Sequence, residues 1–380
     1  MSDIAILNEL TKTEWGKKAR EYIEKNGLPN KRVEFFHYTD LARALSDKIE
    51  SPSGEVRSAN LSADIIIHAT QFGEIVSGAS KDLQIDSVSK ISGYDEDVTT
   101  ILVQGLSKSS QRITLKAGKK ARIAIQRGAG SRTAMHIIVE NGAHLEIIEE
   151  QGADAGLSSG LMFAEIGENA SLRRIMYADT FGAKDIRKSI VNVAKGGEFA
   201  GFSLMRGGEL SRIETDVHLL GEGAKCNFNA AYLLKNAHND ITTTVYHHAP
   251  NCETKEMVRG IVGEGGNAVF QGKIQVERNA QKTSAVMEHR GIMLEDGGKI
   301  NAKPSLEIYA DDVECSHANT IGALDESALF YMQARGISQK SAKILLIKAF
   351  LSQVFDDLQY DDIREYAISR IENRLDEIVG

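Results

Sequence analysis

Apolar and polar residues alternate along the middle of this chain, from about residue 61 to residue 313. Short runs place an apolar side chain at every second position, as in Ile113 with Leu115, Leu145 with Ile147, and Ile274 with Val276. This period is typical of β-strands that bury one face and expose the other. The middle of the chain is therefore predicted to consist of many short strands.

Glycine turns separate these runs at a nearly constant spacing. Gly118, Gly142, Gly167, Gly196 and Gly221 follow one another at intervals of 24, 25, 29 and 25 residues. A recurrence of this length indicates a stacked repeat. Because each repeat contains strands, the pattern favours a β-solenoid, in which every coil covers the apolar edge of the next. A large antiparallel β-sandwich is the alternative.

Helical patterns precede the strands. Thr13 is placed to cap a helix over residues 14–26, and Gly27 to end it. Asp40 is placed to begin a second helix within residues 38–50. No helical period is recognised between this segment and the C-terminal region.

A second helical region follows the strands. Asp325 is predicted to cap a helix that Gly336 ends, and Ser338 to open a long helix that continues in register to the C-terminus. We expect an apolar face on this helix that includes Leu345. The chain thus reads as a mainly β protein with a helical segment at 1–60, a β-helix core at 61–320 and a helical domain at 321–380.

Composition and motifs exclude several classes of function. A net charge of -8 argues against a mainly electrostatic nucleic-acid binder, and no apolar run is long enough to span a membrane. The first residues lack the order of a signal peptide, and three widely spaced cysteines suggest reduced thiols in the cytoplasm. No P-loop pattern occurs, so we expect this chain to bind no nucleotide in that way.

Cys315 and His317 are the candidate site residues. On a strand, residues two apart point the same way, so a thiolate and an imidazole would share one face. Such a pair can bind iron, zinc or an iron–sulfur cluster. A buried cysteine beside a core histidine, or a nucleophilic pair, are the alternatives. The adjacent His247 and His248 would point to opposite faces of a strand and could not bind one ion from the same side.

The C-terminal third resembles a known family. The blocks VFQGKI, AQKTSA and LEIYADDVECSH, followed by LDESALFYMQARGI, resemble the SufB/SufD family of iron–sulfur cluster assembly scaffolds, and its SufD branch in particular. GLPNKRVEFFHYTDL is similar to the family's N-terminal segment. The middle of the chain, about 60–240, resembles the family only in general character and not in specific motifs. His289 and Arg290 stand where family members commonly carry Asn-Arg, and the role of His289 is left open.

The resemblance implies a non-enzymatic scaffold. It implies a right-handed parallel β-helix that pairs with a SufB-like paralogue or a second copy of this chain, and a transient iron–sulfur cluster or iron held by Cys315 and His317 at the pair interface. It also implies that an ABC-type ATPase, SufC-like, docks on the C-terminal helices, where we assign Phe330, Tyr331, Arg335 and Ile337. Capping of the solenoid end is an alternative role for these helices.

A carbohydrate-active enzyme or carbohydrate-binding protein is the other class considered, because β-solenoids often host such sites. Aromatic residues make up only 6% of the chain, and no set of acidic residues stands out on one strand face. These two features argue against that alternative.

Overall fold

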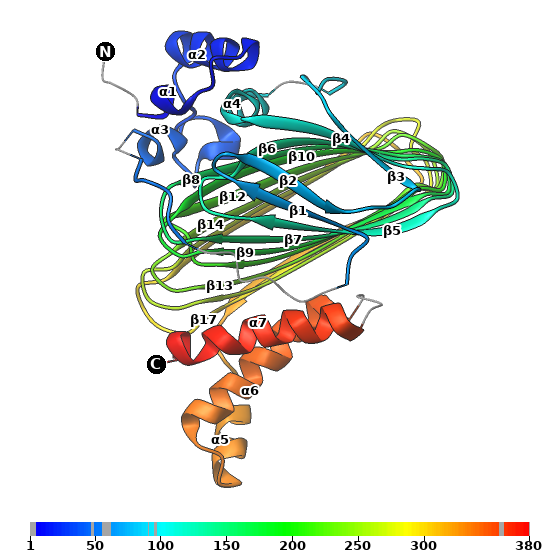
Figure 1. Ribbon diagram of the computed structural model, residues 1–380. Coiled ribbons are helices and arrows are strands. Elements are labelled where there is room, and N and C mark those ends of the chain that lie inside the picture. Colours follow the sequence, from blue (N-terminus) through cyan, green and yellow to red (C-terminus); the bar gives the residue numbers. More distant parts are fainter. Residues whose placement is uncertain are drawn as a thin grey trace.

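The core of the protein is a solenoid of two facing sheets (Figure 1). The computed structural model describes residues 5–46, 49–54, 62–89, 91–94, 97–356 and 361–379. From β4 to β19, successive strands alternate between the sheets, and neighbours within each sheet are parallel. Each coil therefore adds one strand to each sheet. The predicted parallel β-helix is confirmed, and the antiparallel sandwich is wrong.

We call the two sheets the odd sheet and the even sheet. The odd sheet contains β2 (Gly73–Gly78), β1 (Ile65–Thr70), β5 (Lys120–Arg127), β7 (His144–Ala153), β9 (Ser171–Thr180), β11 (Glu198–Arg206), β13 (Lys225–Leu234), β15 (Glu253–Val262), β17 (Thr283–Met293) and β19 (Val313–Gly322). The even sheet contains β3 (Leu83–Ser87), β4 (Ser109–Leu115), β6 (Arg132–Val139), β8 (Leu157–Ile166), β10 (Lys184–Val193), β12 (Leu210–Leu219), β14 (His238–His247), β16 (Asn267–Val276) and β18 (Lys299–Ile308).

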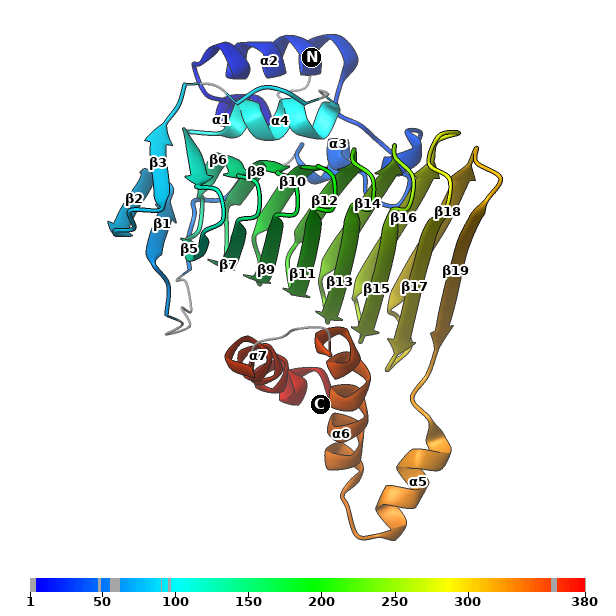
Figure 2. The same ribbon diagram turned by 90° about the vertical axis from the view of Figure 1, so that its right-hand side faces the viewer.

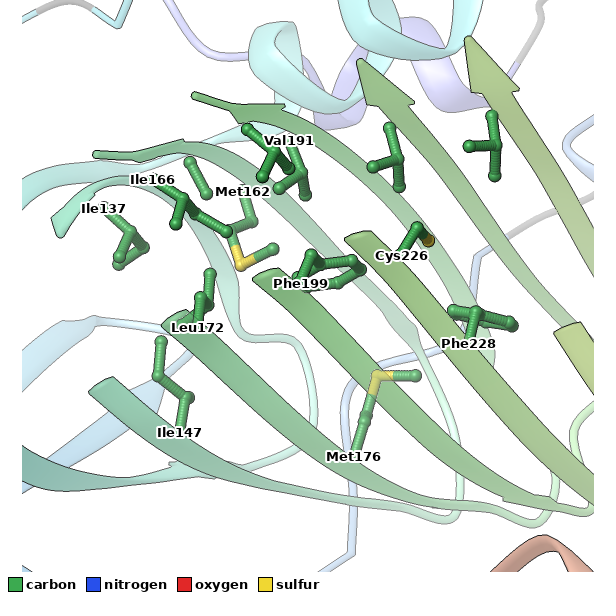
Figure 3. Close-up of a cluster of buried hydrophobic side chains, with 14 of the residues drawn as sticks. Ile137, Ile147, Met162, Ile166, Leu172, Met176, Val191, Phe199, Cys226 and Phe228 are labelled. Carbon is green, nitrogen blue, oxygen red and sulfur yellow. The ribbon is translucent and has the colours of Figure 1, made fainter. Parts of the chain in front are cut away.

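Inward side chains of the two sheets fill the space between them, which we call the bore (Figure 3). The register stacks the same inward position of one coil on that of the next. Leu172, Phe199 and Cys226 occupy one such column, and all three are buried. The period-two pattern thus predicted the bore-facing positions, because alternate strand residues point to opposite faces.

Left-handed residues make the turns between coils. Gly118, Gly142 and Gly196 have φ values of 68°, 68° and 62°, a region that glycine enters without strain. In two other turns the left-handed position moves two residues along, to Asn169 and to Gly223. The glycine spacing therefore marked the coils correctly, although not always the residue that carries the positive φ.

The N-terminal helices are α1 (Ile6–Glu9), α2 (Glu14–Asn26), the 3-10 turn η1 (Glu34–Phe36), α3 (Leu41–Ala44) and α4 (Val98–Leu106). Thr13 caps α2 as predicted, since its side chain accepts a hydrogen bond from the Gly16 amide. Asp40 likewise caps α3, but the helix predicted within 38–50 is wrong in length, because the backbone leaves helical geometry at Leu45. Residues 47 and 48 lie outside the described part of the chain.

Helix α4 is a second correction, because it falls within the region predicted to contain strands alone. It packs between α2 and the outer face of the even sheet, on β8 and β10. Residues 99–106 are all buried. Its β-branched residues favour a strand, which is why the sequence pattern did not reveal the helix. The predicted domain boundary near residue 60 lies outside the described residues.

The C-terminal helices are α5 (Glu326–Ala334), α6 (Gln339–Ser352), the 3-10 turn η2 (Gln353–Phe355) and α7 (Asp361–Val379). Asp325 and Ser338 cap α5 and α6 as predicted. One continuous helix from Ser338 is wrong: α7 packs back against α6. Residues 357–360, within the predicted helix, are not described. No helix within the described residues has the length and apolar content of a membrane span.

Helices α6 and α7 lie along the side of the solenoid, not over its end (Figure 2). Their apolar side chains pack on the outer face of the odd sheet; this cluster includes Ile175, Phe202, Leu233, Ile347 and Ile371. Leu345, expected on the packed face, is instead exposed. The expectation that these helices cap the solenoid end is therefore wrong.

Candidate metal site

Cys315 and His317 lie on β19, the last strand of the odd sheet. The parallel register pairs Cys315 with Ala285 and His317 with Met287. Both partners on β17 are fully buried in the bore. Paired residues on neighbouring strands point to the same face, so the thiol and the imidazole both face the end of the bore.

This end of the solenoid is open. In the inner coils, each inward side chain is covered by the coil that follows, but no further coil follows β19 within the described residues. Cys315 is half-buried against the core, and His317 is exposed. A thiol and an imidazole are thus presented together at an end of the bore that no further coil of the described residues covers.

Burial raises the pKa of the Cys315 thiol above its ordinary value, while a backbone hydrogen bond to Ala285 works in the opposite direction. The carboxylates Asp311, Asp312 and Glu314 are close to this thiol in the sequence, but they are not among the causes of the shift. A thiol with a raised pKa is a poor nucleophile at neutral pH, whereas a metal can still deprotonate it on binding.

His289, whose role the sequence left open, is a core residue beneath this site. Its Nε2 lies 2.9 Å from the Tyr232 hydroxyl and its Nδ1 lies 2.8 Å from Oδ1 of Asn319 on β19. Its ring stacks between those of Tyr232 and Phe270. Burial lowers the pKa of His289 to about 4, so the ring is neutral at pH 7. Its polar contacts join β17 to β19 and, across the intervening β15, to β13, and the sequence did not predict them.

The adjacent His247 and His248 point to opposite sides of the solenoid wall, as predicted. His247 is fully buried in the bore, with Nε2 2.8 Å from the Thr254 hydroxyl. Its pKa is lowered to about 4 by burial. His248 lies on the outside of the solenoid, where its ring contacts Glu277. The two imidazoles therefore cannot share an ion.

Sequence reasoning also missed a cluster of acids on the outer face of the even sheet. Among the described residues, Asp97, Glu214 and Asp216 bring their carboxylate oxygens together. The Lys188 ammonium already occupies the centre of this group, with Nζ 2.7 Å from Asp97 and 2.6 Å from Glu214. The cluster is an internal ion-pair network that ties the N-cap of α4 to β10 and β12.

The proposed docking residues form a separate surface on α5 and the turn after it. Phe330 and Tyr331 are 73% and 59% exposed, and no residue of α5 is buried. The Arg335 guanidinium lies over the Tyr331 ring, 4.9 Å from its centroid, and Ile337 is half-buried. Such exposure of aromatic side chains on a helix marks a surface that can receive a partner.

Residues 122–350 match the family described as SUF system FeS cluster assembly, SufBD core domain. The chain belongs to the SufBD family. The match runs from β5 into α6 and so includes the open end and α5. The SufBD assignment agrees with the resemblance carried by the C-terminal blocks.

The chain is also similar to individual proteins, two of which are named iron-sulfur cluster assembly protein SufD. The chain is 26% identical to the iron-sulfur cluster assembly protein SufD of Escherichia coli, over 97% of this chain and 95% of that protein. It is 27% identical to SufD of Bacillus subtilis, over 55% of this chain and 46% of that protein. Protein ABCI7, chloroplastic, of Arabidopsis thaliana is 29% identical over 64% of this chain and 53% of that protein.

Proposed function

We propose that this chain is a non-enzymatic scaffold subunit on which an iron–sulfur cluster is assembled, with Cys315 and His317 as ligands of the nascent cluster or of iron. The observation that carries the proposal is the joint presentation of these two side chains at the open end of the bore. Membership of the SufBD family favours this function over carbohydrate binding. The three cysteines are free thiols, which supports a reducing, cytoplasmic location.

Two ligands are half of the set of four that an iron–sulfur cluster usually has. The remaining ligands would come from a second chain placed against the open end. A cluster held by few and mixed ligands across two chains can be released, whereas four cysteines of one chain would retain it. The incomplete ligand set therefore suits a carrier of transient cargo.

The pairing surface we propose is the last coil, β17 to β19. β18 and β19 each have one neighbour within the described sheets, so their outer edges offer unpaired backbone groups. Exposed apolar side chains gather on the same coil, namely Val286, Met293, Ile308, Tyr309 and Ile321. A SufB-like paralogue or a second copy of this chain would cover them.

The second partner is an ABC-type ATPase of the SufC kind, docked on α5. Phe330, Tyr331, Arg335 and Ile337 supply the mixture of aromatic, arginine and aliphatic groups that dominates many interfaces. Because this chain has no P-loop sequence, the proposed partner would bind the nucleotide.

Anaerobic reconstitution with iron and sulfide tests the ligand assignment. The parent chain with its pairing partner should develop visible cluster absorption, and the variant Cys315→Ala with His317→Ala should lose most of it. Cys226→Ala is the matched control, because this thiol belongs to the same inward column but is fully covered. Equal iron and sulfide in the double variant and the parent would refute the assignment.

A further inference from the structure

Two histidines that are far apart in sequence meet on the outer face of the even sheet. His218 lies between the inward Val217 and Leu219 of β12 and so points outward. The register places it beside Tyr246 of β14, and His248 follows two residues later. Nδ1 of His218 lies 3.1 Å from Nε2 of His248, and the two ring planes differ by 12°.

A carboxylate fixes the orientation of this pair. Oε1 of Glu277 lies 2.7 Å from Nδ1 of His248. Because the carboxylate accepts the Nδ1 proton, Nε2 of His248 directs its lone pair toward His218, whose Nδ1–H donates to it. The Tyr246 ring stacks on His218 with centroids 4.6 Å apart. Metal-binding histidines in proteins are oriented by carboxylates in this manner.

The geometry points to a binding site for a divalent transition-metal ion of the zinc class, with His218 Nδ1 and His248 Nε2 as its ligands and Glu277 as the orienting carboxylate. Imidazole nitrogens are suitable ligands for zinc, copper and nickel. Water would complete the four-coordinate set that zinc prefers. This site is independent of the cluster site at Cys315 and His317.

Entry of the ion replaces the proton between the rings. The proton of His218 moves from Nδ1 to Nε2, so both ligand nitrogens present lone pairs and no net proton is released. With Zn–N distances of about 2.0–2.1 Å, two ligand nitrogens on a tetrahedral ion lie roughly 3.4 Å apart, close to the present separation. The rings must also tilt toward a common point. The side chains of His248 and Glu277 are 26% and 43% exposed, which leaves solvent on one side for that movement and for the water ligands.

Zinc binding by equilibrium dialysis tests the site. The background is the full chain with Cys315→Ala and His317→Ala, so that the proposed cluster ligands cannot bind the added zinc chloride. This background should bind one more zinc ion per chain than the same chain carrying His218→Ala or His248→Ala. His144→Ala is the control, because it removes an exposed imidazole, whose Nδ1 lies 2.8 Å from the Ser171 hydroxyl, and should leave zinc binding unchanged.

Glu277→Gln should weaken zinc binding without abolishing it, because it keeps both histidine ligands and removes the orienting charge. Zinc affinity should fall by about 10- to 100-fold. Shifts of the His218 and His248 ring resonances on zinc addition should accompany binding. Equal zinc content in the background and in both histidine variants would refute the proposed site. A loss of bound zinc in His144→Ala as large as that in the two histidine variants would refute it as well. Failure of this test leaves the reconstitution test of Cys315 and His317 unaffected, and the converse also holds.

Discussion

β13 and β19 have the same length and lie in the same sheet, yet they have opposite surroundings. Eight of the ten residues of β13 are buried, whereas most residues of β19 are exposed. β13 has a neighbouring strand on both sides, and its outward Ala231 and Leu233 are covered by the C-terminal helices, whereas β19 has β17 as its one neighbour among the described residues. Burial in a solenoid is supplied by the next coil, so the last coil can offer its inward side chains to another molecule.

The two ends of the solenoid also differ. At the N-terminal end, β2 pairs antiparallel with β1, and β3 pairs antiparallel with β4, so antiparallel edge strands end both sheets there. At the C-terminal end, the parallel strands β18 and β19 are the edges, and α6 and α7 turn aside to the outer face of the odd sheet. Both ends have exposed edge strands, and Cys315 and His317 lie at the C-terminal one.

Glu149 and three arginines form a buried ion-pair network in the inner coils. Glu149 points into the bore and forms ion pairs with Arg127, Arg174 and Arg187. Burial alone would raise the pKa of Glu149, yet the three guanidinium groups hold it well below its usual value. Such a network has no spare bonding capacity for cargo. At the open end, by contrast, the side chains of Cys315 and His317 are not part of such a network within the described residues.

Loss of Glu149 should be the most damaging of the changes considered. Glu149→Ala leaves three buried guanidinium groups without their shared carboxylate, and breaking a buried ion pair costs about 3–5 kcal/mol of unfolding free energy. Urea unfolding measures this, with the exposed Glu198→Ala as a control that should change by less than about 0.5 kcal/mol. A cost below about 1 kcal/mol for Glu149→Ala would contradict the contrast between closed coils and open end.

Glu256, in the bore on β15, should make stability depend on pH. Burial raises its pKa from 4.5 to about 7, so the native state keeps a proton that the unfolded state has already lost. The contribution of Glu256 to stability should therefore fall as pH rises from about 4.5 through 7, by on the order of 3 kcal/mol in total, and level off above that. The lowered pKa values of His247 and His289 act in the opposite direction over nearly the same range, so the contribution is measured as the difference between the unfolding free energies of the parent and of Glu256→Gln at several pH values. A difference that does not change with pH would contradict it.

A methyl group added inside the closed bore should cost more than one added at the open end. A Cβ at Gly260 would lie 1.7 Å from the Tyr232 ring, whereas a Cβ at Gly322 meets nothing within 4 Å. We expect Gly260→Ala to lose about 1–3 kcal/mol or more, and Gly322→Ala to change by less than about 0.5 kcal/mol. Thermal and urea unfolding compare the two. Similar losses at both positions would show that the last coil is covered in the isolated chain.

The smallest effect on stability should come from α5. Replacing Phe330 and Tyr331 by serine should change the unfolding free energy by less than about 0.5 kcal/mol, because both rings are exposed. Binding to the ABC-type ATPase should nevertheless weaken by about tenfold or more. Phe72→Ser removes a ring that is 90% exposed near the opposite end and should leave ATPase affinity unchanged. Undiminished binding by the α5 variant would place the dock elsewhere.

Helix prediction failed where local preference and tertiary environment disagree. VTTILVQGL, the sequence of α4, is rich in β-branched residues, whose local preference is for a strand. It is helical because it is enclosed by α2 on one side and the even sheet on the other. The caps at Thr13, Asp325 and Ser338 were predictable, since a cap acts within four residues of itself.

The sequence by itself determined the face that each strand buries, the approximate length of each coil and the shared direction of Cys315 and His317, because these depend on neighbours one to a few residues away. Only the tertiary structure decided which residues meet across coils. The meeting of His218 with His248, the Lys188 network and the burial of His289 depend on register between residues that lie from 26 to 91 positions apart in the sequence. That register is set by the length and geometry of every intervening turn, and no local pattern reports it.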